Sequence, residues 1–103
     1  MPLPTLTNEQ RAAAAARATA ARRVRAEVRA SLRSSAMSVS EVLQRASSDD
    51  AVAKLRVITV LESLPGIGKV KAESAMSRLG IAMSRRLKGL GPNQVAALTR
   101  EFG

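Results

Sequence analysis

The stretch that most constrains the fold of this chain lies at residues 61–76, where two helical patterns meet at a short turn. Residues 64–69 read LPGIGK, with Gly66 and Gly68 on either side of one apolar residue. Glycine reaches positive φ angles at little cost, so this spacing allows a tight turn with an exposed backbone. The first amides of the following helix have no partner within that helix and can bind an anion. The stretch therefore predicts a helix-hairpin-helix, a motif that contacts a nucleic-acid backbone.

The backbone of this turn and the charges beside it are expected to form one phosphate-binding site. Two lysines at the start of the following helix add positive charge. The alternative is an ordinary turn between two helices, which often contains glycine. The basic helix after the turn favours the nucleic-acid interpretation, although such contacts position a protein and read no base sequence. The expected groups are the amides of Gly66, Ile67, Gly68 and Lys69, the side chains of Lys69 and Lys71, and, for a monovalent cation, the carbonyls near Leu64 and Ile67.

Composition excludes several other classes of function. The 103 residues include 17 basic and 8 acidic side chains, a net charge of +9, so a polyanion is the expected partner. Without cysteine or histidine, the chain lacks the usual parts of disulfides, zinc sites and general-base chemistry, and a reducing cytoplasm is compatible. Phe102 is the only aromatic residue, which argues against single-strand binding by base stacking. We expect no enzymatic activity, no cofactor and no membrane span, with Glu62, Glu73 and Glu101 as isolated charges on helix surfaces.

The charge is concentrated at the two ends of the chain. Residues 1–36 and residues 65–103 each hold seven basic and two acidic side chains, whereas residues 37–64 hold three basic and four acidic ones. We therefore expect a scaffold in the middle and contact surfaces at the ends. As structural segments, we expect an N-terminal arm with a long basic helix at residues 1–36 and a helical domain at residues 37–103, forming one unit overall.

The N-terminal segment predicts one long helix. Residues 7–10 read TNEQ, a capping box, and no glycine or proline follows before about Arg33. Such a helix is roughly 40 Å long at 1.5 Å per residue, longer than a domain of this size can cover. Residues 1–4 contain two prolines and are expected to form an arm. The half before about Ala20 is mostly alanine, so we expect it to be weakly ordered or to form only against a partner.

Two stripes run side by side along this helix. At 100° per residue its arginines share one face, and an apolar stripe lies next to them. The helix can therefore dock on a core while its arginines contact a nucleic-acid backbone. The alternative is that these arginines only keep an alanine-rich helix soluble. The basic stripe comprises Arg11, Arg22, Arg25, Arg29 and Arg33, and the apolar stripe Ala21, Val24, Val28 and Leu32.

The rest of the chain predicts further helices and no sheet. Residues 38–41 read SVSE, a second capping box, and a short helix is expected at residues 50–54. Residues 55–61 are β-branched and could form a strand, but their apolar spacing fits a helix and no partner strand is available. Gly80 should end the helix at residues 69–79, and Pro92 should begin the last helix. The expected core positions are Val39, Val42, Leu43 and Ala46, then Val57, Val60, Leu61 and Leu64, then Val70, Ala75, Met76 and Leu79, and finally Val95, Leu98 and Phe102.

A second basic cluster follows the predicted hairpin. We expect Ser84 to cap a short turn that carries Arg85, Arg86 and Lys88, and the four residues to form a second phosphate clamp. The forked guanidinium groups are also candidates for the minor groove or a guanine edge. The alternative is a solvated run of charge. Three clamps along one duplex would favour bent over straight DNA.

Four segments in combination resemble actinobacterial integration host factor over essentially the whole chain. They begin at residues 3, 21, 61 and 79 and include LESLPGIGKV and SRRLKGLG. The resemblance implies an S13-like helix-two-turn-helix fold behind a long first helix. It also implies binding of double-stranded DNA with little sequence preference, bending and compaction, phage integration and an influence on supercoiling. The implied partners are phage integrase and topoisomerase, the implied state is a monomer, and the implied location is the nucleoid in the cytoplasm.

Two other functions remain open at this stage. The S13-like fold allows a structural RNA-binding role of the ribosomal type, although the chain lacks a basic tail and base-stacking aromatics. A fragment of a repair enzyme would share the hairpin but would need a catalytic acid or amine in a pocket.

Overall fold

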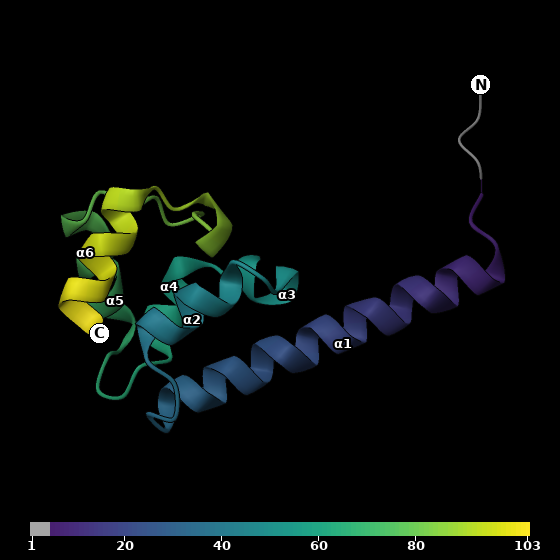
Figure 1. The fold of residues 1–103 in the computed structure, drawn as a ribbon, viewed down its shortest axis with the longest axis horizontal. Helices are drawn as coiled ribbons and strands as arrows, with labels where there is room; N and C mark the ends of the chain where they lie inside the picture. The colour runs from purple at the N-terminus through teal and green to yellow at the C-terminus, as the bar shows by residue number, and fades with distance from the viewer. Residues whose placement is uncertain (1–4) are drawn as a thin grey trace.

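The computed structural model describes residues 5–103, and every regular element in this range is helical. The elements are α1 (Asn8–Arg33), α2 (Val39–Ala46), α3 (Asp50–Ala53), α4 (Val57–Glu62), α5 (Lys69–Arg78), the 3₁₀ helix η1 (Leu87–Gly89) and α6 (Pro92–Phe102). The shorter helices gather beside the C-terminal half of α1, and the N-terminal half projects away from them (Figure 1). The predicted all-helical class with a long first helix is confirmed. The expected arm at residues 1–4 lies outside the described residues.

Local hydrogen bonds define both ends of α1. The Thr7 hydroxyl accepts from the Gln10 amide at 3.1 Å, and the Gln10 side-chain oxygen accepts from the Thr7 amide at 2.8 Å, so the predicted capping box is present. At the other end Ser35 adopts a left-handed φ of 63°. The Ala36 amide then donates to the Ser31 carbonyl at 2.8 Å, which closes the last turn.

The two halves of α1 have different surroundings. Val28 and Leu32 are fully buried, as the apolar stripe predicted, and Val24 packs against the same core. Between residues 8 and 20 only Ala14 is not fully exposed. The helix is continuous through this half, and its expected weak order in the free protein stays a prediction.

Helices α2 to α4 form the scaffold beside α1. The Ser38–Glu41 capping box is present, and the Asp49 side chain accepts from the Ala51 amide at 3.1 Å at the start of α3. Residues 57–62 form α4, which confirms the helical interpretation for most of the stretch at residues 55–61. Its first two residues are not helical, because Arg56 has an extended backbone and pairs with Arg86 in an isolated bridge. The core cluster consists of Val28, Leu32, Val39, Val42, Val52, Leu55, Val57, Val60, Leu61, Ala72, Ala75, Met76, Ile81, Leu87 and Leu98.

Helix α5 begins where predicted, and its buried face agrees with the prediction except at Val70. Ala72, Ala75 and Met76 are buried, whereas Val70 is 80% exposed, so its expected core position is wrong. At 100° per residue Val70 lies about 200° round the helix from Ala72, on the opposite side from the core. The end of α5 is as predicted: Gly80 has a φ of 66°, and the Ile81 amide donates to the Met76 carbonyl at 2.9 Å.

The segment between α5 and α6 departs from the expectation at Ser84. The Arg85 amide donates to the Ala82 carbonyl at 2.9 Å, and η1 begins only at Leu87 with no side-chain cap. Ser84 is therefore a central residue of the turn at residues 82–85 and does not cap η1, whose N-cap is Arg86. Pro92 begins α6 as predicted, and Leu98 is buried while Val95 and Phe102 are half-buried.

One apolar core unites the described part of the chain. Side chains of α1 and of all the following helices contribute to it, including Leu32 and Leu98 from either end. The division at residues 36 and 37 stays a prediction. Between residues 5 and 103, no helix combines the length and the hydrophobicity that crossing a bilayer requires.

Candidate nucleic-acid interface

A basic groove lies between α1 and the segment that joins α3 to α4. Its volume is about 400 Å³, and six of its eight lining side chains are cationic, with no carboxylate among them. Three of the cations come from α1 and the others from segments distant in sequence. Its lining residues are Arg22, Arg25, Arg29, Lys54, Leu55, Arg56, Thr59 and Arg86.

The far wall of this groove is held by a short backbone pairing. The Leu87 amide donates to the Leu55 carbonyl at 2.9 Å, and the Val57 amide donates to the Arg85 carbonyl at 3.0 Å. These two bonds flank the antiparallel bridge between Arg56 and Arg86. Because Leu55 and Leu87 are buried on either side, we infer that the two arginines face outward, into the groove that both line.

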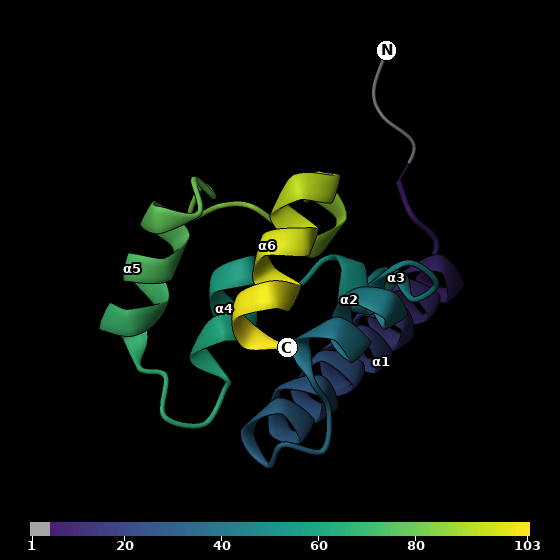
Figure 2. The same ribbon diagram turned by 60° about the vertical axis from the view of Figure 1, so that its left-hand side comes forward.

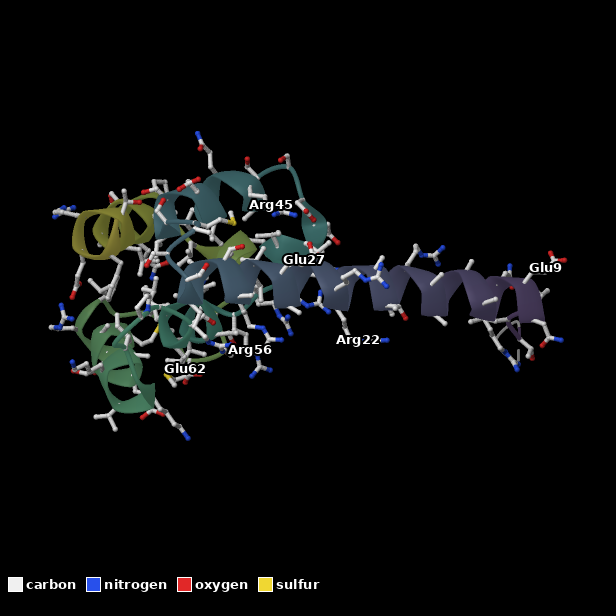
Figure 3. The ribbon with its side chains drawn as sticks, turned by 90° about the horizontal axis from the view of Figure 1, so that it is seen from below. Glu9, Arg22, Glu27, Arg45, Arg56 and Glu62 are labelled. Carbon is white, nitrogen blue, oxygen red and sulfur yellow. The ribbon has the colours of Figure 1, made fainter. Side chains whose placement is uncertain are left out.

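Acidic side chains lie outside the lining of the groove, although Asp50 lines an adjoining pocket with Arg25 and Lys54. Figure 3 shows Arg22 and Arg56 on the same side of α1, whereas Glu27 lies on the opposite side. Within residues 5–103, the carboxylates that form ion pairs do so with Arg45, Lys54 and Arg78. Lys54 is thus partly neutralised by Asp50 at 3.0 Å, while the groove arginines have no carboxylate partner in this part of the chain.

The hairpin forms a second basic surface, at the other end of α4. Gly66 adopts a φ of 75°, as the turn was expected to require, and Gly68 is the N-cap of α5, which has no side-chain cap. Since α4 spans six residues, its ends lie roughly 9 Å apart. No hairpin residue lines the groove. Figure 2 shows the loop between α4 and α5 at the opposite end of α4 from the segment that enters it.

The amides of the hairpin are not equivalent. The Ile67 amide donates to the Leu64 carbonyl at 3.2 Å and closes the turn. The amides of Gly68 and Lys69 make no backbone hydrogen bond within residues 5–103 and remain available for a ligand. Lys69 and Lys71 are exposed beside them. The cation expected near Leu64 and Ile67 stays a prediction.

The predicted basic cluster after α5 is divided by the fold. Arg86 lines the groove and donates through Nη1 to the Lys54 carbonyl at 2.6 Å. Arg85 instead donates to the Gly89 carbonyl at 2.8 Å, and Lys88 lies beside Leu43 and Val95 on another face. Ser84 is exposed. The fold thus places only Arg86 of these four residues in the groove.

The predicted arginine stripe of α1 is also divided. Its middle members, Arg22, Arg25 and Arg29, line the groove, whereas Arg33 lies at the end of α1, outside it, and is exposed. Arg11 is on the projecting half of the helix.

Glu101 is not the isolated charge that the sequence suggested. Its carboxylate accepts two hydrogen bonds from the Arg78 guanidinium, at 2.5 and 3.0 Å. These bonds lower the pKa of the Glu101 carboxyl, against a smaller opposing effect of burial, and raise that of Arg78. The pair joins α5 to α6 and lies outside the groove.

Four residues that line the groove were not predicted from the sequence: Lys54, Leu55, Arg56 and Thr59. Lys54 and Arg56 belong to the segment that was near neutral overall and was interpreted as scaffold. Their position in the sequence could have identified them. They lie between the short capped helix α3 and the apolar helix α4, where two basic side chains must be exposed. Within residues 5–103 no three acidic side chains gather as a metal site would require.

Comparison with known proteins places these features in a family. A family model described as an S13-like H2TH domain matches residues 32–102. The integration host factor of Streptomyces coelicolor is 55% identical over 103 residues, covering 100% of this chain and 96% of that protein. The integration host factor of Mycobacterium tuberculosis is 50% identical over 103 residues, covering 100% of this chain and 98% of that protein.

A solved structure agrees with the sequence relatives. It is described as the structure of sIHF bound to an 8bp palindromic DNA, and it superposes with a TM-score of 0.82 at 53% identity, covering 84% of this chain and 98% of that one. The full-length sequence relatives, the matched domain and the solved structure all indicate the same family. The chain belongs to the family of actinobacterial integration host factors and carries its S13-like H2TH domain.

Proposed function

We propose that this protein is a nucleoid-associated protein that binds double-stranded DNA largely without sequence specificity and bends and compacts it. Its family comprises DNA-binding architectural proteins and not enzymes. The observation that carries the proposal for this chain is the groove with six cations and no carboxylate in its lining. Such a surface attracts the phosphate backbone whatever the base sequence.

The proposed contacts fall into two groups. Arg22, Arg25, Arg29 and Arg86 bind one run of phosphates in the groove, and Lys54 and Arg56 join them. The hairpin binds a second run through the amides of Gly68 and Lys69, with Gly66 and Ile67 shaping the turn and Lys69 and Lys71 supplying charge. Ser84, Arg85 and Arg33 add contacts outside the groove, whereas Lys88 lies on another face and would need a separate contact.

The salt dependence of affinity tests this proposal directly. If six to eight phosphates are neutralised, log affinity for a duplex should fall with log salt at a slope of about −5 to −7. Fluorescence anisotropy with two duplexes of unrelated sequence would measure the slope. We expect similar affinities for both duplexes, and a slope near zero would rule out backbone binding.

The family suggests finer roles that need separate tests. We propose that the protein supports phage integration and supercoiling control, with a phage integrase and a topoisomerase as protein partners. We also propose that it is a monomer in the cytoplasm and located on the nucleoid. Sedimentation without DNA would test the oligomeric state, and plasmid topoisomer analysis with topoisomerase present would test the effect on supercoiling.

A structural RNA-binding role is the second candidate, favoured by the S13-like description of the matched domain. Duplex DNA and structured RNA of equal length would compete differently under the two hypotheses. We expect the DNA to displace the RNA, and tighter binding of the RNA would reverse the assignment.

A further inference from the structure

The bridge between α4 and η1 places two like charges directly opposite each other. In an antiparallel pairing the hydrogen bonds lie either within a residue pair or on either side of it. Here they flank the pair, since they run from Val57 to Arg85 and from Leu87 to Leu55. Arg56 and Arg86 therefore form the close, non-hydrogen-bonded type of pair, in which Cα atoms approach to about 4.5 Å.

This pairing is unfavourable in the protein by itself. Like charges directly opposite each other across a ladder destabilise it. Neither arginine forms an ion pair within residues 5–103, and the shared groove has no carboxylate in its lining. The other charged residues that line the groove are Lys54 and the three arginines of α1, and all of them are cationic. Solvent screens part of this repulsion, because both side chains are exposed, and the Lys54 carbonyl accepts a hydrogen bond from Arg86. A bound anion would relieve the repulsion that remains.

The side chains are also oriented for a ligand. Arg86 uses Nη1 to bind the Lys54 carbonyl at 2.6 Å, which fixes the guanidinium and leaves its other N–H groups available. Arg56 is exposed at the mouth of the same groove, beside Thr59 on the next turn of chain. The guanidinium group of Arg86 is thus held in place, and that of Arg56 can adjust on the same side of the bridge. Two such groups together suit a tetrahedral oxyanion.

We propose that Arg56 and Arg86 form a two-guanidinium clamp for a single backbone phosphate of DNA. This inference rests on the proposed function and specifies the groove as the site of that phosphate. The repulsion between the two arginines destabilises the free protein, and a bound phosphate relieves it. Arg56 is then a binding residue that the neutral charge of its own segment conceals.

The substitution Arg56→Gln tests the clamp, with Arg100→Gln as the matched control. Arg100 is exposed on α6, forms no ion pair within residues 5–103 and lies outside the groove. The melting temperature would be measured at low ionic strength in chloride and, at matched ionic strength, in inorganic phosphate. We expect R56Q to melt above wild type in chloride and to lose most of the phosphate-specific rise. R100Q should behave as wild type in both respects.

Duplex binding by the same three proteins completes the test. We expect R56Q to lose affinity about ten-fold, in keeping with a charge-assisted hydrogen bond, and R100Q to lose much less. Equal behaviour of R56Q and R100Q in both assays overturns the clamp while leaving DNA binding intact. Loss of the phosphate response with unchanged DNA affinity overturns the assignment to DNA backbone, because the pair would then bind free anions. Failure of the wild-type protein to bind any duplex would instead overturn the proposed function.

Discussion

At the scale of single residues, Arg78 and Glu101 show how one charge pair can connect two helices. They lie 23 residues apart in the chain and join α5 to α6 through two hydrogen bonds. Arg78 holds the pKa of the Glu101 carboxyl below its ordinary value of 4.5, chiefly through these hydrogen bonds. A carboxyl with a lowered pKa in the folded state stabilises the fold above its unfolded pKa. This contribution is lost as the pH falls from about 4.5 through the lowered value.

The substitution Glu101→Gln should therefore change the acid sensitivity of the protein. We expect the melting temperature of this variant to fall less than that of wild type between about pH 6 and pH 3, because a glutamine side chain has no carboxylate to protonate. Glu73→Gln is the control, since Glu73 forms no ion pair within residues 5–103. Thermal melts across this range would measure the difference, and parallel curves for wild type and E101Q would contradict it.

Val70 shows why residue type alone did not identify the buried face of α5 at every position. An apolar residue two positions before Ala72 lies about 200° away from it on a helix, so both cannot face the core. Ala72, Ala75 and Met76 lie within one helical face and are buried there. Alanine carries a weak apolar signal, whereas valine carries a strong one. The stronger signal therefore misplaced this one position, whereas the predicted Ala75 and Met76 are buried and Leu79 packs against the core.

At the scale of elements, short-range hydrogen bonding made most helix ends predictable. Two helices begin with capping boxes, at Thr7 and Ser38, and α5 ends at the left-handed Gly80. Each of these features involves residues no more than five positions apart, so a local sequence pattern identified it. The bridge from Arg56 to Arg86 is different, because it pairs segments 30 positions apart that are each too short to form a strand. Its contribution to the groove therefore had no sequence signature.

The hairpin can be tested by adding a methyl group at Gly68. This residue has an extended backbone, with a φ of −89°, and an added Cβ meets no atom within 4 Å. Gly68→Ala should leave the fold intact and reduce its stability only modestly, because alanine is a poorer N-cap than glycine. If the Gly68 amide lies against a phosphate, the methyl group obstructs that approach, and duplex affinity should fall several-fold.

Gly80→Ala provides the matched control for this prediction. Gly80 has a φ of 66° and ends α5 away from the hairpin, so alanine there should cost about 1 kcal/mol of stability. Its effect on DNA affinity at a temperature where the protein remains folded should be small. Thermal melts and anisotropy titrations of both variants would separate the two cases. Unchanged DNA affinity in G68A would exclude a close phosphate at this amide.

At the scale of the whole molecule, the structure contains a packed half and a projecting half of α1. The projecting half buries almost nothing, and isolated helices of its length are marginal in water. We expect its amides, at residues 8–20, to exchange hydrogen much faster than those of α2 and α4 in the free protein. Addition of a duplex should slow this exchange. Hydrogen exchange followed by mass spectrometry would measure it, and equal protection of all helices without DNA would contradict the expectation.

The length of α1 also has a consequence for spacing along a nucleic acid. Arg11 and Arg33 are separated by 22 positions of one continuous helix, which corresponds to about 33 Å. One turn of B-form DNA advances by roughly 34–36 Å. A duplex lying along α1 would therefore present the same side of its helix to both arginines. In that arrangement α1, once ordered on the duplex, would span about one turn of DNA between its two terminal arginines.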